Sequence, residues 1–339
     1  MKQAVMVAPG KIVFNEVEKP APNADEVILQ TQRIGVCGSD IHVYHGLHPY
    51  TGYPVVQGHE VGGVVAAVGA NVTHVKAGDK ITFMPQVTCG ECYPCKHGMY
   101  HICESLKVMG FQTGGAAQEY FALPADNVLK LPDSMSVDEA AMIEPIAVTV
   151  HALERGGGAA GKRVIVLGAG AIGNLTAQVA KASGAKAVMI TDVSDYKLAK
   201  ARECGIEYTV NAASENLGEA IARDFGPDKA DLILECVGVE ATMTDAVQYA
   251  RKGSTIVVVG VFGKKPQVDL GLVQDRELTL TGTLMYQRGD YERAIGLVAS
   301  GKMHLDAMIT HRFPFDQYLD AYHTIEAVRG DYLKVMIEL

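Results

Sequence analysis

The sequence lacks three features that mark common classes of protein. Positive charge is not in excess, since the 339-residue chain has a formal net charge of -9 at pH 7, whereas nucleic-acid-binding proteins usually carry a basic face. No apolar run approaches the roughly 20 residues that a membrane-spanning helix needs. The N-terminus, Met1–Val5, shows no apolar segment with a cleavage site that would indicate secretion. We therefore expect no nucleic-acid partner, no membrane association and a cytoplasmic location.

The length of the chain exceeds what a single core usually organises, so two domains are expected. Hydrophobic residues make up 48% and charged residues 20%, which is ordinary for a globular protein. The chain has seven cysteines, and in a cytoplasmic protein these are more often metal ligands than disulfides. Cys204 and Cys236 have no partners at ligand spacing and are expected to be core thiols.

Helical periodicity longer than two turns is absent before residue 135. Short β-prone segments are separated there by turn residues such as Pro20, Pro22 and Asn23. This pattern predicts a compact, irregular β domain. The predicted strands are Lys11–Phe14, Glu26–Gln30, Val61–Val68 and Lys80–Phe83.

One set of candidate metal ligands lies in this part of the chain. Cys37 offers a thiolate, His59 an imidazole and Glu60 a carboxylate. These are the ligand types of a catalytic zinc that keeps one coordination position open. Alternatively, His59 and Glu60 are a loop dipeptide and Cys37 is a small buried side chain.

A second set has the spacing Cys-x2-Cys-x2-Cys-x7-Cys and comprises Cys89, Cys92, Cys95 and Cys103. Four thiolates complete a tetrahedral zinc site and leave no position for chemistry, so this zinc would be structural. An iron–sulfur cluster is the competing interpretation, because the first three cysteines share the bacterial ferredoxin spacing. In that motif, however, a proline follows the last cysteine, and here it follows Cys92-Tyr93.

The second half begins with a change of pattern. The apolar run Val164–Leu167 predicts a strand buried on both faces, and Gly168, Gly170 and Gly173 then form Gly-x-Gly-x-x-Gly before a helical pattern over 174–183. A second strand, Ala187–Thr191, ends at Asp192, about 20 positions after the last glycine. This is the context of a dinucleotide site, in which the glycines allow a tight turn, approach of the pyrophosphate and close helix packing.

Further strands alternate with helical segments, which predicts a doubly wound parallel sheet. These strands are 231–236, 254–259 and 278–281; a helix over 291–300 and a last strand over 333–337 follow. The glycine-rich segment 156–161 is a candidate hinge or loop between the domains.

The run Gly58-His59-Glu60, with spaced glycines at 62, 63 and 69 and a valine at 72, is the signature of the zinc-containing medium-chain alcohol dehydrogenases, and the chain resembles that superfamily. Within it, the chain is similar to the polyol (sorbitol-like) and threonine dehydrogenase branch. The resemblance implies a GroES-like β-barrel catalytic domain (1–146), a Rossmann NAD-binding domain (147–285) and a return segment (286–339) completing the first.

The resemblance also implies site residues. Glu144, in the pair Glu144-Pro145, matches a glutamate at or near the catalytic zinc; Glu60 and Glu144 would both ligate or exchange with water. The alternative for Glu144 is a carboxylate favoured at a helix start. Ser39 and His42 match positions that relay the proton outward, although a capping serine and a surface histidine are the ordinary alternatives.

Cofactor contacts follow from the same resemblance. Backbone groups of Val259, Gly260, Val261, Thr283 and Leu284 are expected to hold the nicotinamide, and Ile172 and Lys197 to border the cofactor; plain packing at strand ends is the alternative. Asp192 predicts NAD rather than NADP, because a carboxylate binds both ribose hydroxyls and repels a 2′-phosphate.

The implied reaction is reversible oxidation of a secondary alcohol to a ketone by NAD. The loop 44–53 carries His45, His48, Tyr50 and Tyr53 but no Lys or Arg, which favours a polyol or sugar-derived substrate over L-threonine or an aldonate. A non-catalytic relative and a zinc-free reductase are the other classes considered. Retention of the Cys37, His59 and Glu60 set together with the glycine fingerprint disfavours the first, and the second would need neither cysteine set. By resemblance the chain forms a homo-oligomer, a dimer or a tetramer.

Overall fold

The computed structural model describes all 339 residues and divides into two compact units. The first comprises Met1–Glu144 and Ile309–Leu339, and the second comprises Pro145–Met308. The chain passes from one to the other inside helix α3 (Val137–Arg155). It returns to the first unit after Met308, whereas the sequence analysis expected the return after residue 285, because helix α9 (Arg288–Ala299) belongs to the second unit. There Asp290 of α9 is paired with His151 of α3 at 2.8 Å.

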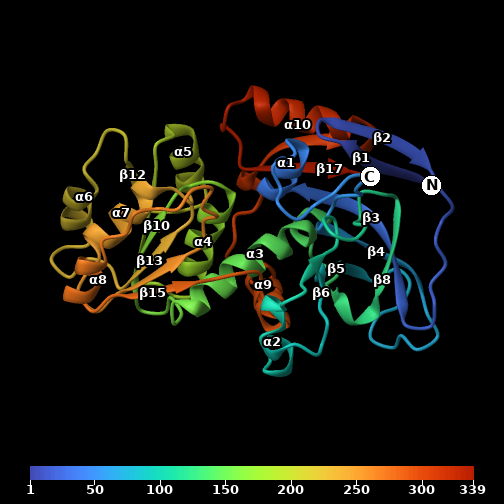
Figure 1. Cartoon of the computed structure of the whole chain (residues 1–339), viewed down its shortest axis with the longest axis horizontal. Coiled ribbons are helices and arrows are strands. Elements are labelled where there is room, and N and C mark those ends of the chain that lie inside the picture. Colours follow the sequence, from blue (N-terminus) through green and yellow to red (C-terminus); the bar gives the residue numbers. More distant parts are fainter. The chain divides into compact units, whose positions relative to one another are not determined.

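The first unit is mainly antiparallel β structure (Figure 1). Its strands are β1 (Lys2–Ala8), β2 (Lys11–Glu16), β3 (Glu26–Val36), β4 (Glu60–Val68), β5 (Lys80–Phe83), β6 (Gln86–Val87), β7 (Lys107–Val108), β8 (Tyr120–Pro124), β9 (Val128–Lys130), β16 (Ile309–Pro314) and β17 (Lys334–Glu338). The main sheet has the order β16-β17-β3-β4-β5-β9, with β8 also paired to β3. The C-terminal strand β17 therefore lies in the same sheet as β3, as the expected return segment requires.

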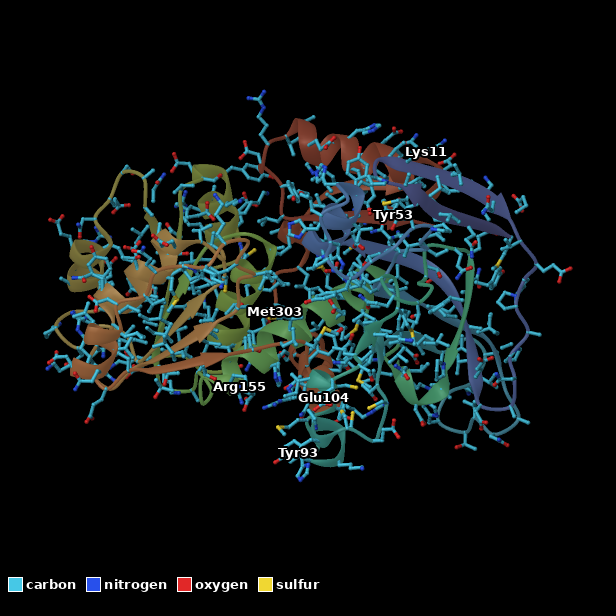
Figure 2. All side chains as sticks on the ribbon, in the orientation of Figure 1. Lys11, Tyr53, Tyr93, Glu104, Arg155 and Met303 are labelled. Carbon is cyan, nitrogen blue, oxygen red and sulfur yellow. The ribbon has the colours of Figure 1, made fainter.

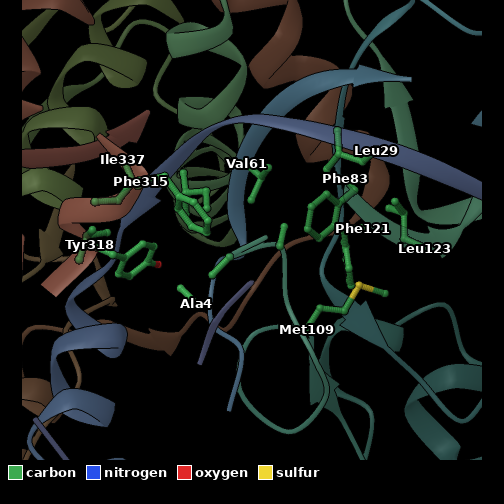
Figure 3. Packing of buried hydrophobic residues seen from close by; sticks show 14 of the residues in the cluster. Ala4, Leu29, Val61, Phe83, Met109, Phe121, Leu123, Phe315, Tyr318 and Ile337 are labelled. Carbon is green, nitrogen blue, oxygen red and sulfur yellow. The ribbon is translucent and has the colours of Figure 1, made fainter. Parts of the chain in front are cut away.

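Helices in the first unit are short. They are α1 (Gly38–Tyr44), α2 (Tyr93–Lys96), α10 (Tyr318–Ala327) and the 3-10 turns η1 (Tyr100–Ile102), η2 (Ala125–Asn127) and η4 (Phe315–Gln317). The core is built from the inward side chains of the strands. The ring centroids of Phe83 and Phe121 are 5.8 Å apart, and Leu29 and Leu123 lie beside them (Figure 3). Phe315 joins the same core from the C-terminal segment.

The second unit is a parallel six-stranded sheet of order β12-β11-β10-β13-β14-β15. The strands are β10 (Arg163–Leu167), β11 (Ala187–Asp192), β12 (Tyr208–Asn211), β13 (Leu232–Glu235), β14 (Thr255–Val258) and β15 (Thr279–Gly282); the helices are α4 (Ala171–Ala182), α5 (Asp195–Glu203), α6 (Leu217–Asp224), α7 (Glu240–Tyr249), α8 (Leu270–Asp275) and α9, with the turn η3 (Asp306–Met308). The order reverses between β10 and β13, which is the doubly wound arrangement expected from the alternating pattern.

Helices cover both faces of this sheet, with α4 and α5 against β10, β11 and β12, and α6, α7 and α8 packed successively against one another (Figure 1). The central strands are buried on both sides: Val164, Ile165 and Val166 are at most 1% exposed. This explains their uninterrupted apolar pattern.

Two local expectations are corrected. Helix α4 begins at Ala171, inside the glycine motif, rather than at residue 174, because Gly170 is extended and caps the helix. The glycine-rich segment 156–161 is not a hinge between units; it lies within the second unit, between α3 and β10. None of the helices has the length and apolarity needed to cross a membrane.

Candidate active site and metal centres

The strand pairing of the first unit brings the first candidate ligand set together. Glu60 opens β4 opposite Gly35 of the antiparallel strand β3, and Cys37 follows directly after β3 ends at Val36. The donor atoms of Cys37, His59 and Glu60 consequently lie within 4.8 Å of one another. His59 and Glu60 are buried and Cys37 is half-buried. A thiolate, an imidazole and a carboxylate in this arrangement fit a zinc ion with an open position.

The carboxylate of Asp40 lies beside Nδ1 of the His59 ring. Its Oδ1 lies 3.7 Å from Nδ1 of His59, and that buried nitrogen has no hydrogen bond of its own. Burial lowers the pKa of His59, but Asp40 and the hydrogen bond to Cys37 outweigh burial and raise this pKa to about 10. A carboxylate beside the second nitrogen of a ligand histidine orients the ring and increases its basicity. The pair therefore favours metal binding, in which the metal replaces the proton.

Asp40 is itself held by a buried network. Its Oδ2 accepts a hydrogen bond from the backbone N–H of Cys37 at 2.9 Å, and its Oδ1 accepts one from Nε2 of Gln57 at 3.1 Å. The hydroxyl of Tyr322 donates to Oε1 of Gln57 at 2.7 Å. The sequence analysis missed these three residues. Only Asp40, three positions after a ligand cysteine, carried a local signal.

Glu60 has an unexpected partner in Lys334, at the start of β17. The Lys334 ammonium lies 2.6 Å and 2.8 Å from the two Glu60 carboxylate oxygens and 3.5 Å from the carbonyl of Val36. Burial lowers the pKa of Lys334, but Glu60 outweighs burial, so the pKa lies above its usual value. Gly35 is required opposite, because a β-carbon there would lie 2.2 Å from Oε2 of Glu60.

The structure does not bring Glu144 into the ligand group formed by Cys37, His59 and Glu60. Glu144 is 6% exposed and lies inside α3 rather than at a helix start. Its charge contributes to raising the pKa values of both His59 and Lys334, so it lies within electrostatic reach of the site. Glu144 is therefore a carboxylate near the ligand group but not a member of it.

Ser39 and His42 both lie on α1, three positions apart and hence on neighbouring positions of one helical face. Ser39 is half-buried and His42 is exposed. The step from the half-buried Ser39 to the exposed His42 suits a path by which a proton leaves the site. No hydrogen bond connects either side chain to the ligand group.

The second cysteine set is compact. The Sγ–Sγ distances are 3.5 Å for Cys89–Cys103, 3.8 Å for Cys92–Cys103 and 4.0 Å for Cys89–Cys95. Four sulfurs at about 2.3 Å from one zinc are about 3.8 Å apart in a tetrahedron, which these distances match. An iron–sulfur cluster would hold the thiolates further apart, because several irons and sulfides lie between them. The spacing therefore fits a single ion.

Backbone hydrogen bonds favour thiolates at Cys89 and Cys103 of this lobe, whereas burial raises the pKa of Cys95 to about 12. The N–H of Cys92 donates to Sγ of Cys89 at 3.3 Å, and the N–H of Cys89 donates to Sγ of Cys103 at 3.4 Å. Backbone hydrogen bonds from Glu91 and Cys92 lower the pKa of Cys89 to about 6. The lobe reaches the surface, with Tyr93 65% exposed at its outer end (Figure 2). The lobe thus lies at the surface and is held together by local hydrogen bonds. A zinc ion bound by its four thiolates would need no open coordination position.

The glycine fingerprint of the second unit has the geometry of a dinucleotide cradle. Gly168 has φ +100° directly after β10, a conformation that favours glycine. A β-carbon on Gly170 would meet nothing within 4 Å, whereas one on Gly173 would lie 1.8 Å from the carbonyl oxygen of Gly168. The open space at Gly170 and the N-terminus of α4 beside it fit a pyrophosphate.

Asp192 at the end of β11 also braces this cradle. Its Oδ2 accepts a hydrogen bond from the N–H of Ala169 at 2.8 Å and its Oδ1 accepts one from Ser194 at 2.9 Å. Lys197 and Ile172 are half-buried on α5 and α4. The carboxylate is therefore positioned beside the loop that would hold the cofactor.

The remaining cofactor candidates lie at the carboxyl ends of adjacent strands. Residues 259–261 follow β14 and residues 283–284 follow β15, and the N–H of Thr283 donates to the carbonyl of Val258 at 3.3 Å. Val261 is 84% and Leu284 55% exposed. Parallel strands present their carboxyl ends along one edge, where ligands bind in such sheets.

Glu235, missed by the sequence analysis, organises this edge. Its backbone carbonyl accepts hydrogen bonds from Val259 and Gly260, both at 2.8 Å, and its buried Oε1 accepts from the N–H groups of Val237 and Gly238. Its neighbour Cys236 is half-buried rather than a core thiol, and desolvation raises the pKa of this thiol to about 12. Burial likewise raises the pKa of Cys204 to about 11.

Comparison with known proteins agrees with this geometry. Residues 23–133 match the alcohol dehydrogenase GroES-like domain and residues 171–300 match the zinc-binding dehydrogenase domain. The chain is 35% identical to D-xylulose reductase of Saccharomyces cerevisiae, over 98% of this chain and 96% of that protein, and 32% identical to L-galactonate-5-dehydrogenase of Escherichia coli, over 95% and 94%.

Among solved structures, a zinc-binding dehydrogenase from Sinorhizobium meliloti bound to NADP superposes with a TM-score of 0.93. It is 31% identical and the match covers 100% of this chain and 99% of that one. Matching domains at both ends of the chain, together with full-length relatives, establish the family. The chain is an oxidoreductase and belongs to the zinc-containing medium-chain alcohol dehydrogenases.

Proposed function

We propose that this protein oxidises a polyol or another sugar-derived secondary alcohol to a ketone, with NAD as the hydride acceptor. The observation that carries the proposal is the group of Cys37, His59 and Glu60, whose donor atoms lie within 4.8 Å of one another. The relatives support the substrate class, since they include a xylulose reductase and a galactonate dehydrogenase. The first unit would serve as the catalytic domain and the second as the nucleotide-binding domain.

A zinc ion held by Cys37 and His59 would supply Lewis-acid stabilisation of the substrate alkoxide. The chain's own residues determine the rest of the site. Asp40 fixes the ring orientation of His59. Glu60, with Glu144 nearby, provides the third ligand or leaves its place to water. The half-buried Ser39 and the exposed His42 provide a route by which the hydroxyl proton reaches solvent.

The four-cysteine lobe would hold a second, structural zinc. Its thiolates fill a tetrahedral sphere, so no coordination position is left for a substrate. Cys89, Cys92, Cys95 and Cys103 lie within a short loop, and the ion would fix that loop in place of a hydrophobic core. In this proposal, the lobe contributes to stability and not to the reaction.

The second unit would bind the cofactor along its glycine fingerprint. The N-terminus of α4, beside Gly168 and Gly170, receives the pyrophosphate, and the strand-end residues Val259, Gly260, Val261, Thr283 and Leu284 border the nicotinamide. Ile172 and Lys197 would border the remaining part of the cofactor. Asp192 makes NAD the preferred cofactor, although a relative of the same fold was solved with NADP. The working form would be a homo-oligomer, a dimer or a tetramer.

The proposal is tested by a substrate screen that follows NADH formation across polyols, aldonates, vicinal diols and L-threonine, with metal content measured on the same preparation. We expect two zinc ions per chain, one for each ligand set, and the highest kcat/KM for a polyol. A kcat/KM for L-threonine well above that of every polyol would replace the polyol by an amino alcohol. Absence of NADH formation with every alcohol would refute the enzymatic role.

A further inference from the structure

The polar residues of the loop 44–53 have distinct environments. His45 pairs with Glu326 at 3.6 Å, the hydroxyl of Tyr53 donates to the carbonyl of Val43, and Tyr50 is 77% exposed. Their polar groups are thus committed elsewhere or face solvent. His48 is the member of this set whose surroundings lead toward the ligand group.

Two ring contacts connect His48 to the ligand group through Phe111. The His48 ring lies parallel to Phe111, with centroids 4.9 Å apart and an interplanar angle of 9°. Phe111 also contacts the ligand candidate His59, with centroids 4.8 Å apart and an interplanar angle of 46°. His48 therefore lies one aromatic ring away from the ligand group.

The two nitrogens of His48 differ in their partners. Nδ1 lies 2.7 Å from the hydroxyl oxygen of Thr51, whereas Nε2 makes no hydrogen bond within the chain. Burial, followed by the charges of His42 and His59, lowers the pKa of His48, so the ring is neutral at pH 7. In the tautomer of the neutral ring that carries its proton on Nε2, the Thr51 hydroxyl donates to Nδ1, so the 2.7 Å contact is compatible with an Nε2–H donor.

Resting on the proposed function, we propose that His48 is a substrate-binding residue whose Nε2–H donates a hydrogen bond to a second hydroxyl group of the substrate, near the carbon that is oxidised. The loop carries no Lys or Arg, so a neutral hydroxyl suits this position better than a carboxylate. The protein would thus select polyols over alcohols with a single hydroxyl group.

The test compares two probes, xylitol and butan-2-ol, by their kcat/KM values. His48→Phe keeps a flat ring against Phe111 but removes the donor. We expect the ratio of kcat/KM for xylitol to that for butan-2-ol to fall about 10-fold, the effect of one lost hydrogen bond of about 1.4 kcal/mol. The fall should come from KM for xylitol rather than from kcat.

Further variants separate recognition from packing. His48→Gln restores an N–H near the place of Nε2 and should recover most of the ratio, although it cannot stack as the imidazole does. Thr51→Val removes the hydroxyl that pairs with Nδ1 of His48. The ratio should then fall about 3-fold, because the Nε2–H of His48 is less well oriented. His74→Phe, an exposed histidine elsewhere in the same unit, is the matched control and should leave the ratio unchanged.

The outcomes distinguish this inference from the proposed function. If the wild type oxidises xylitol and His48→Phe keeps the wild-type ratio, His48 only packs the loop, and the proposed function stands without it. His48 is likewise only a packing residue if His48→Gln loses as much selectivity as His48→Phe. If the wild type oxidises neither probe nor any other polyol, the proposed function fails and the role of His48 fails with it.

Discussion

Lys334 and Glu60 form an ion pair inside the first unit, with N–O distances of 2.6 Å and 2.8 Å and side chains that are 3% and 1% exposed. The two residues lie 274 positions apart in the chain. Because Glu60 is also a member of the candidate ligand group, the lysine and a bound metal ion would compete for one carboxylate. In the proposed function, the ion pair would hold Glu60 when water or substrate takes its coordination position.

Lys334→Met should reveal this competition in the stability of the protein. Removing one partner of a buried ion pair costs about 3–5 kcal/mol, because the other charge is left uncompensated. We expect that loss in the metal-free protein and a smaller loss in the zinc-loaded protein, where the metal compensates Glu60. Denaturant unfolding with and without zinc measures both, and Lys334→Arg is the conservative control. An equal loss in both forms would show that Glu60 never leaves the lysine for the metal.

His59→Ala tests the ligand group itself. Changes in the outer shell of a metal site alone cost about 10- to 100-fold in activity or affinity, so the loss of a ligand should reduce turnover by more than that. NAD binding should survive, because the glycine fingerprint lies in the other unit. Turnover and NAD affinity are measured on the same sample, with His74→Ala as the control. Wild-type turnover without His59 would exclude the zinc mechanism.

The ligand group was predictable because its residues belong to one short antiparallel pairing. Cys37 directly follows β3 and Glu60 begins β4, so residues of the right chemical types meet by local topology. The partners behind them were not predictable. Lys334 and Tyr322 come from the C-terminal segment, and ordinary lysine and tyrosine residues carry no signal of burial beside a metal site.

In the second unit, too, local patterns were predictable from the sequence and contacts between separate residues were not. The strand and glycine pattern predicted β10 and the doubly wound parallel sheet, because buried parallel strands have a continuous apolar sequence. The start of α4 was misplaced, since Ala171 and Gly173 look like turn residues until the close contact of Gly173 with Gly168 is known. The expected hinge at 156–161 was wrong because glycines also terminate helices such as α3.

Cys95→Ser tests the lobe. Part of the free energy of zinc binding is free energy of folding, so we expect a loss of about 3 kcal/mol, which lowers Tm by roughly 6–12 °C for a unit of this size. Metal content should fall by one ion per chain. Cys204→Ser, outside both ligand sets, is the control for replacing a cysteine. Full metal content and an unchanged Tm in Cys95→Ser would show that the four thiols bind no structural ion.

The ion pairs of Asp138 indicate that the stability of the first unit depends on pH. It pairs with Arg33 at 2.7 Å and with Arg312 at 2.8 Å. Burial raises its pKa, but the two guanidinium groups outweigh burial, so the pKa lies below its ordinary value of 3.8. The carboxylate therefore contributes stability that is fully present above pH 3.8 and is lost as the pH falls through the lower, folded-state pKa.

Asp138→Asn should accordingly cost about 1 kcal/mol at pH 7, as expected for a partly exposed ion-pair network. The difference from the wild type should shrink as the pH falls below 3.8. Unfolding in urea at pH 7, 5 and 3 measures this, and Asp133→Asn, on a residue in no ion pair, is the control. A difference that stays constant across this range would assign the effect to shape rather than to charge.

Asp192→Ser tests the choice of cofactor. The carboxylate is placed to accept hydrogen bonds from the adenosine ribose and to repel a 2′-phosphate. A hydrogen bond to a charged group contributes about 1.5–3 kcal/mol, so kcat/KM with NAD should fall about 10- to 100-fold while that with NADP falls less or rises. Asp192 also holds the N–H groups of Ala169 and Ser194. Asp192→Asn removes the charge but keeps one of the two acceptor oxygens, so part of the bracing of the loop remains when the charge is lost. Equal efficiency of the wild type with NAD and NADP would contradict the proposed preference.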